Sequence, residues 1–259
     1  KDPSHFNHSI LLSLPDTIST EHLEKAVKEI HIHHDALRMS YEIIGNNLTQ
    51  INNDIGNDTP FIVEDLTSLD PDNIDNKINE LTINYHKNID ISKGKLFNAV
   101  LFRTGNNSGN KLLIIVHHLC IDGISWRIIL EDLYRLYNNF QNNEDPKLPF
   151  KTISFKKWSY IIKEYSNSTD LKKEFDHWKE VSTESLIISQ KDFNENLNIV
   201  TSEENVNIEF SKEDTGLILK DVHKSYNTQI NDILLTALIL AFNKWNGENK
   251  LLLNLEGHG

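Results

Sequence analysis

The sequence has little cysteine, no clustered positive charge and no long apolar run, and each absence excludes a class of protein. The sequence has a single cysteine, Cys120, which rules out an internal disulfide and any zinc cluster built from cysteines. Such low cysteine content fits a reducing compartment. The formal net charge of -12 comes without a basic stripe, which disfavours nucleic-acid and anionic-membrane surfaces. No apolar run approaches the roughly 18 residues that a membrane-spanning helix needs, and residues 1–15 do not resemble a signal peptide. We therefore expect a cytoplasmic protein that binds neither nucleic acid nor membrane.

What is present is enough apolar sequence for a core, since 38% of the 259 residues are hydrophobic. Apolar residues at helical spacing predict helices, and short apolar or alternating runs predict strands. The helices are expected at residues 20–33, 72–87, 125–140, 154–165, 169–181, 211–226 and 229–246. The strands are expected at residues 9–14, 37–44, 47–51, 97–103, 111–117, 206–210 and 250–255, with a polar loop at 192–205.

The run LLIIV at residues 112–116 does not alternate, which predicts a central strand covered on both faces. Helices and strands are mixed without a regular βαβ rhythm, which favours an α/β sandwich with a mixed sheet over a doubly wound fold. The acidic, asparagine-rich loop that begins at Gln141 is the first candidate linker. We therefore expect one compact lobe over residues 1–150, followed by linker helices and a further unit over residues 151–259.

Chemistry is concentrated in the segment from His117 to Gly123, where two histidines end a buried apolar strand and Asp122 follows. Buried histidines need hydrogen-bond partners, and neighbouring strand residues point to opposite faces. A shared metal is therefore a poor interpretation, because zinc needs both rings on one side and further ligands. Two interpretations stay open from these residues alone. One ring is a general base with the other as its support, or both are satisfied structural groups.

The pattern His-His-x-x-x-Asp-Gly resembles the signature of the superfamily of chloramphenicol acetyltransferase, which includes the condensation and epimerization domains of nonribosomal peptide synthetases. Its continuation, Ser125-Trp126-Arg127, is similar to the epimerization branch. The segment from Tyr226 to Ala237 resembles that branch's Asp-x-x-Leu-Leu-x-Ala motif, and the last residues resemble the start of Glu-Gly-His-Gly-Arg-Glu. The resemblance implies a chloramphenicol acetyltransferase-like αβ sandwich, present as the N-terminal lobe plus the beginning of the second lobe.

The resemblance also implies roles for single residues. It makes His118 the catalytic histidine and Glu256 the catalytic glutamate, with His117, Asp122, Gly123 and His258 in support. Residues 32–38 resemble the family's Arg-His-Glu-x-Leu-Arg segment, but His33 and Asp35 replace its first Arg and its Glu. Arg38 is then the arginine of this block that could reach Asp122, or else a surface residue of a hairpin. Trp126 is expected in the core rather than on substrate, and Cys120 is expected to be structural.

The activity implied is epimerization of an aminoacyl or peptidyl thioester, in which one group removes the Cα proton and another returns one from the opposite face. The partners implied are a peptidyl or acyl carrier domain bearing 4'-phosphopantetheine and neighbouring synthetase modules, with no cofactor or metal bound directly. The alternatives are a condensation domain that forms peptide bonds and a non-catalytic fragment that docks a carrier. We expect the chain to be an incomplete piece of such a domain, whose activity as a fragment the sequence leaves open.

Overall fold

The structure is a computed structural model that describes residues 3–45, 47–56, 59–105, 109–183 and 199–255. The chain folds into two compact units, and the boundary between them lies between Lys163 and Glu164. Each unit is described by itself. The assignment of residues 1–150 to one lobe and of residues 151–259 to linker helices and a second lobe stays a prediction.

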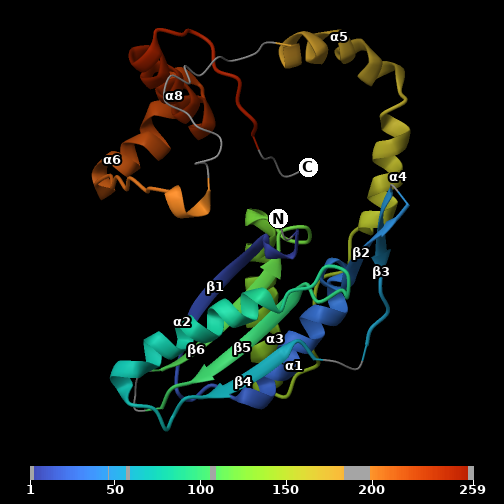
Figure 1. Cartoon of the computed structure of the whole chain (residues 1–259), viewed down its shortest axis with the longest axis vertical. Helices are drawn as coiled ribbons and strands as arrows, with labels where there is room; N and C mark the ends of the chain where they lie inside the picture. Colours follow the sequence, from blue (N-terminus) through green and yellow to red (C-terminus); the bar gives the residue numbers. More distant parts are fainter. Residues whose placement is uncertain (1–2, 46, 57–58, 106–108, 184–198, 256–259) are drawn as a thin grey trace. The chain divides into compact units, whose positions relative to one another are not determined.

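The first unit alternates strands and helices without a repeating order (Figure 1). Its strands are β1 (Asn7–Leu14), β2 (Met39–Ile44), β3 (Asn47–Asn52), β4 (Phe61–Asp65), β5 (Phe97–Arg103) and β6 (Asn110–His117). Its α-helices are α1 (Thr20–His33), α2 (Pro71–Lys87) and α3 (Gly123–Gln141), and α4 (Phe155–Tyr165) crosses its boundary with the second unit. Short 3-10 turns lie at Pro3–His5 and Asp35–Arg38. The helices predicted at residues 20–33, 72–87 and 125–140 are thus confirmed.

Four strands form one mixed sheet in the order β1-β6-β5-β4. β6 pairs antiparallel with both β1 and β5, whereas β4 pairs parallel with β5 at the edge. β4 was not predicted from the sequence. Its five residues, FIVED, end in two carboxylates, and only pairing with β5 identifies them as a strand. The mixed sheet that the sequence predicts is present.

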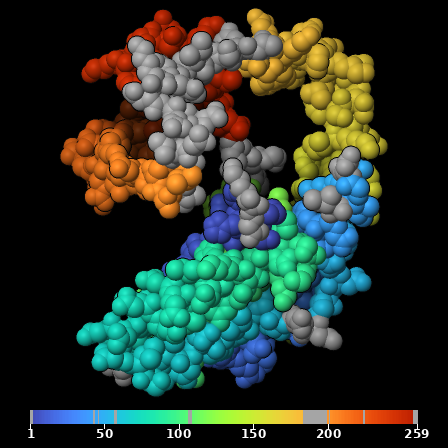
Figure 2. All heavy atoms as spheres, viewed as in Figure 1, coloured from blue at the N-terminus to red at the C-terminus, as the bar shows by residue number. Residues whose placement is uncertain are grey.

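Both faces of this sheet are covered. On one face the inner residues of α1 and α3, such as Ile30 and Leu136, pack against Leu112, Ile114 and Val116 of β6. On the other face α2 packs against the alternate β6 residues Leu113 and Ile115. Figure 1 shows α2 across the sheet from α1 and α3, and in the space-filling view α2 covers the near face (Figure 2). The run LLIIV is therefore central and buried on both sides, as its lack of alternation predicts.

A separate hairpin joins β2 and β3, and Gly45 in its turn has a φ of +65°, a conformation that glycine adopts without strain. The hairpin was predicted to begin at Leu37, which is wrong by two residues. Asp35–Arg38 instead forms a 3-10 turn between α1 and β2. Leu37 is buried in the core there, so the turn packs its side chain without a partner strand.

The second unit is helical in the described residues, with α5 (Thr169–Thr183), a 3-10 turn at Val200–Ser202 and α8 (Ile230–Asn246). Between them α6 (Lys212–Gly216), a π-helical turn (Leu217–Asp221) and α7 (Val222–Tyr226) follow one another over the predicted helix 211–226. The strands predicted at 206–210 and 250–255 are wrong. Neither segment pairs with any described residue, and a strand forms only with a ladder partner. Residues 192–198 of the predicted loop lie outside the described residues, and the rest of it contains the 3-10 turn at Val200–Ser202.

None of the helices described is both long enough and apolar enough to pass through a lipid bilayer. The most apolar of them, α8, carries Asp232 in its first turn and Lys244 in its last.

The packing of α2 on the sheet generates a matched test with two isoleucines of one helix. Ile78 is 2% exposed beneath the sheet, and Ile83 is 57% exposed on the solvent side. Ile78→Ala removes buried methyl groups and leaves a cavity, so it should lower the free energy of unfolding by about 2–5 kcal/mol. Ile83→Ala should change it by about 0.5 kcal/mol or less. Denaturant unfolding of both variants measures the difference, and equal losses would contradict the described packing.

Candidate active site

The candidate site lies where β6 ends and the chain turns into α3. At this end of β6 the backbone hydrogen bonds to the neighbouring β5 and β1 sides of the sheet continue past the strands themselves. The amide of His117 donates to the carbonyl of Leu96 at 2.9 Å, and the amide of His118 donates to the carbonyl of Phe6 at 2.9 Å. The two successive residues are thus bound to opposite neighbours of β6, and their side chains leave the strand in different directions.

His117 is a buried and fully bonded imidazole, with 2% of the residue exposed. Its Nδ1 accepts a hydrogen bond from the amide of Leu119 at 3.1 Å. The proton of the neutral ring therefore lies on Nε2, which donates to the carbonyl of Pro3 at 2.9 Å. Both nitrogens are engaged in holding the loop and the N-terminal turn, so His117 has the contacts of a structural residue.

His118 is half-buried and has the opposite hydrogen-bond pattern. Its Nδ1 lies 2.9 Å from the carbonyl oxygen of Ile121, which can only accept, so Nδ1 carries the proton and donates. In the neutral ring the basic nitrogen is then Nε2, on the edge away from the loop backbone. A backbone carbonyl that fixes the tautomer in this way prepares a histidine for accepting a proton at a defined atom.

A third histidine, His8, lies against His118. The ring centroids of His8 and His118 are 4.0 Å apart, with the ring planes tilted by 36°. His8 is on β1, opposite Val116 of β6. The signal in the sequence was the alternation of β1, because His8 occupies the same face as Ile10, Leu12 and Leu14, which pack on the core.

Asp122 caps α3. Its Oδ1 accepts from the amide of Ser125 at 2.7 Å and from the Ser125 hydroxyl at 2.6 Å, which is the usual arrangement at a helix N-terminus. The expectation that Asp122 bonds to Arg38 is therefore wrong. The physical reason is local, because the carboxylate has backbone and hydroxyl donors of its own helix within three residues.

Arg38 also differs from its second interpretation, as a surface residue, because only 7% of it is exposed. Its guanidinium donates to the carbonyls of His31 and Ile32 at the end of α1, the second at 2.8 Å, and to Asp35 at 2.8 Å. Capping the last carbonyls of a helix is a common role for arginine. Arg38 thus stabilises the turn between α1 and β2.

A part-buried hydrogen bond links this turn to the helix that follows the site. The Nε2 atom of His34, at the C-terminus of α1, lies 2.9 Å from a carboxylate oxygen of Asp132 on α3. Asp132 is buried, so its carboxylate needs such a partner.

The remaining residues of the motif have structural contacts. Trp126 packs half-buried against the core cluster of α1, α3 and the sheet, as expected. Burial raises the pKa of the Cys120 thiol to about 12, and its Sγ donates to the carbonyl of His117 at 3.1 Å. A thiol held neutral in this way is a poor nucleophile. Gly123 begins α3, and an added Cβ would meet no atom within 4 Å. No steric need for glycine is visible there.

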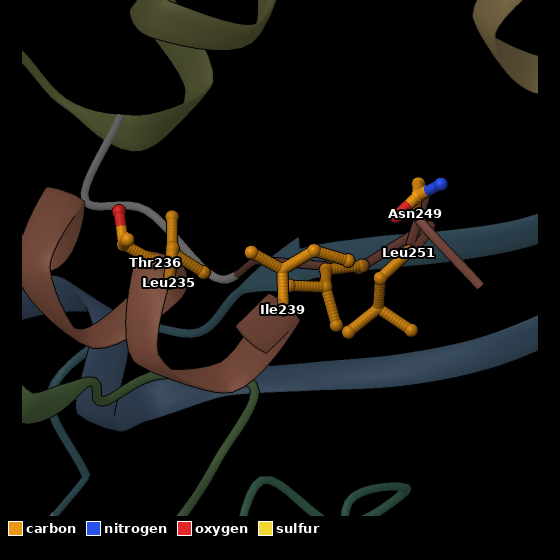
Figure 3. A pocket seen from close by; sticks show the side chains of 6 residues that line it. Leu235, Thr236, Ile239, Asn249 and Leu251 are labelled. Atoms are coloured by element: carbon orange, nitrogen blue, oxygen red, sulfur yellow. The ribbon is translucent and has the colours of Figure 1, made fainter. Parts of the chain in front are cut away.

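Glu256 and His258 lie outside the described residues, so their predicted roles stay predictions. A hollow of about 330 Å³ in the second unit lies between α8 and the following segment, where Leu235, Ile239 and Leu251 gather (Figure 3). None of the described residues that line it has a titratable side chain. In the part of the chain that is described, no three histidine, cysteine or carboxylate side chains are grouped to hold a metal ion.

The fold is a mixed α/β sandwich of the chloramphenicol acetyltransferase-like type. The model of the Condensation domain family matches residues 1–259, and the chain belongs to this family. It is 36% identical to surfactin synthase subunit 2 of Bacillus subtilis over 256 residues, which cover 98% of the chain and 7% of that protein. It is 38% identical to gramicidin S synthase 1 of Brevibacillus brevis, over 98% of the chain and 23% of that protein. The chain thus spans a small part of these relatives.

Two solved structures place the fold more closely. The epimerization domain from the third module of tyrocidine synthetase B matches with a TM-score of 0.86 at 31% identity, over 96% of this chain and 56% of that one. The starter condensation domain of rhizomide synthetase matches with a TM-score of 0.59 at 16% identity, over 70% of this chain and 43% of that one. The second likeness shows the fold alone. Together they confirm the predicted αβ sandwich with a mixed sheet.

The capping role of Asp122 generates a stability test. Asp122→Ala removes the acceptor of two hydrogen bonds and should lower the free energy of unfolding by about 0.5–2 kcal/mol, whereas Asp122→Asn keeps an acceptor oxygen and most of the stability. Asp75→Ala, at an exposed position within α2, is the matched control and should be nearly neutral. Thermal unfolding compares the three, and the cap assignment fails if Asp122→Ala is no less stable than Asp75→Ala.

Proposed function

We propose that the chain is part of an epimerization domain that converts the L form of a carrier-bound aminoacyl or peptidyl thioester to the D form. The observation that carries the proposal is the state of His118. Its Nδ1 proton is held by the Ile121 carbonyl, so Nε2 is the atom that accepts a proton. The likeness to the tyrocidine epimerization domain over 96% of the chain supports the same reaction class.

Inversion of configuration at Cα needs a base on one side of the substrate and an acid on the other. In the proposed reaction His118 Nε2 removes the proton from Cα, and the electron pair of that bond moves into the thioester carbonyl to give an enolate. The carboxylic acid of Glu256 then returns a proton to Cα from the opposite face, and the enolate electrons re-form the bond. The assignment of Glu256 rests on the Glu-Gly-His-Gly pattern alone.

The substrate class follows from the acidity that the reaction needs. A thioester acidifies its α-proton more than an amide does, so the substrate should be carried on a phosphopantetheine arm. The proposed partners are therefore a peptidyl or acyl carrier domain and the neighbouring modules of a peptide synthetase. The likeness to curated synthase proteins supports these partners.

A condensation activity is the second candidate, because the family and the rhizomide starter domain share the fold. The same histidine would then assist attack of an amine on a thioester. Incubating the full-length protein with an L-aminoacyl-loaded carrier in deuterated water separates the two reactions. Epimerization gives D product with deuterium at Cα, whereas condensation gives a new amide bond without it.

His118→Ala and Glu256→Gln should each lower the rate of deuterium entry at Cα by about a hundredfold or more, the usual scale for a positioned acid or base. His117→Ala should act through stability instead, because it breaks the two hydrogen bonds of a buried ring. Mass spectrometry of the released amino acid measures the exchange, and circular dichroism reports folding. Near-normal exchange in folded His118→Ala would falsify the assignment of the base.

A further inference from the structure

We propose that the imidazole ring of His8 is a positioning group that fixes the orientation of the His118 ring. The inference rests on the proposed function, because it gives His8 a part in presenting the base. His8 itself contacts no reacting atom in this scheme. Its ring acts on the substrate only through His118.

The sheet brings the two residues together by register. His8 is paired with Val116, and the amide of His118 donates to the carbonyl of Phe6, the residue just before the same strand. Val116 faces the core cluster formed with α1 and α3, as do Ile10, Leu12 and Leu14 of β1. His8 is the next residue of this inner face, at the end of β1 nearest the site.

Packing of the inner face of β1 does not by itself require a histidine at position 8. An apolar side chain would extend the inner face of β1 at lower cost than a histidine, whose nitrogens need polar partners or water. In the described part of the chain the His8 ring makes no hydrogen bond, and its ring contact is with His118 at 4.0 Å between centroids. The arrangement therefore serves the ring of His118 rather than the hydrogen bonding of His8.

Two contacts with described residues then hold the His118 ring from different sides. The Ile121 carbonyl holds the Nδ1 edge at 2.9 Å, and His8 covers a face of the ring with a tilt of 36°. Rotation about the bond that joins the ring to Cβ would break the first contact or drive the ring into the second. Nε2 is thereby held in one direction, and a displacement of about 1 Å at such an atom is enough to slow a reaction about a hundredfold.

The test compares removal of the ring with removal of its nitrogens in the full-length protein. His8→Ala should lower kcat for deuterium entry at Cα by about tenfold or more and leave KM for the loaded carrier unchanged. His8→Phe keeps a ring of similar size and should restore most of kcat. His22→Ala is the matched control, because His22 is a half-buried histidine whose ring contacts Tyr137 on α3 instead. The proposal is overturned if His8→Ala keeps its kcat, or if His8→Phe is as slow as His8→Ala.

A second readout is independent of activity. The hydrogen on the carbon between the two nitrogens of His118 exchanges slowly with deuterium, and mass spectrometry of peptides follows it in proteins of any size. Exposing the covered face in His8→Ala should make this exchange faster, with no change in His8→Phe or His22→Ala. If it becomes faster while His118→Ala keeps normal Cα exchange, the proposed function fails and the ring contact stands. If His118→Ala is inactive and His8→Ala changes neither readout, the positioning role alone fails.

Discussion

The hydrogen-bond ladder of β6 is the constraint on which the rest of the site depends. β6 lies between β1 and β5, and helices cover both of its faces, so its register is fixed on both edges and both sides. A shift of one residue would move every side chain to the other face and exchange the environments of His117 and His118. The packing of the lobe therefore decides which of two adjacent histidines is buried and which is presented.

The loop after β6 converts this geometric difference into a chemical one. His117 donates from Nε2 and accepts at Nδ1, whereas His118 donates from Nδ1. The two rings are thus opposite tautomers held by the same short loop. Asp122 ends the loop by capping α3, so the same short loop holds the His118 ring and begins the helix. Burial keeps the Cys120 thiol neutral, which removes a competing nucleophile from the same loop.

Local patterns predicted the parts of the fold that local physics determines. The apolar spacing of α1 and the continuous run of β6 were sufficient, and α1 begins and ends where the sequence predicts. The errors at residues 206–210 and at β4 involve contacts between distant segments, whereas those at Leu37 and Asp122 come from a local turn and a local helix cap. Residues 206–210 alternate but have no described partner, and β4 is a strand only because β5 pairs with it. The capping of α1 by Arg38 depends on a turn, and the ring contact of His8 depends on the register between β1 and β6.

We propose that His118 presents a reactive Nε2 while His117 does not. Diethylpyrocarbonate acylates accessible neutral imidazole nitrogens, and fragmentation of the labelled peptide assigns the adduct to one residue of the pair. At a pH above the ordinary histidine pKa, brief treatment of the folded full-length protein should label His118, with protection by a loaded carrier, and leave the buried His117 unlabelled. Labelling of His117 as fast as His118, or faster, would contradict the account.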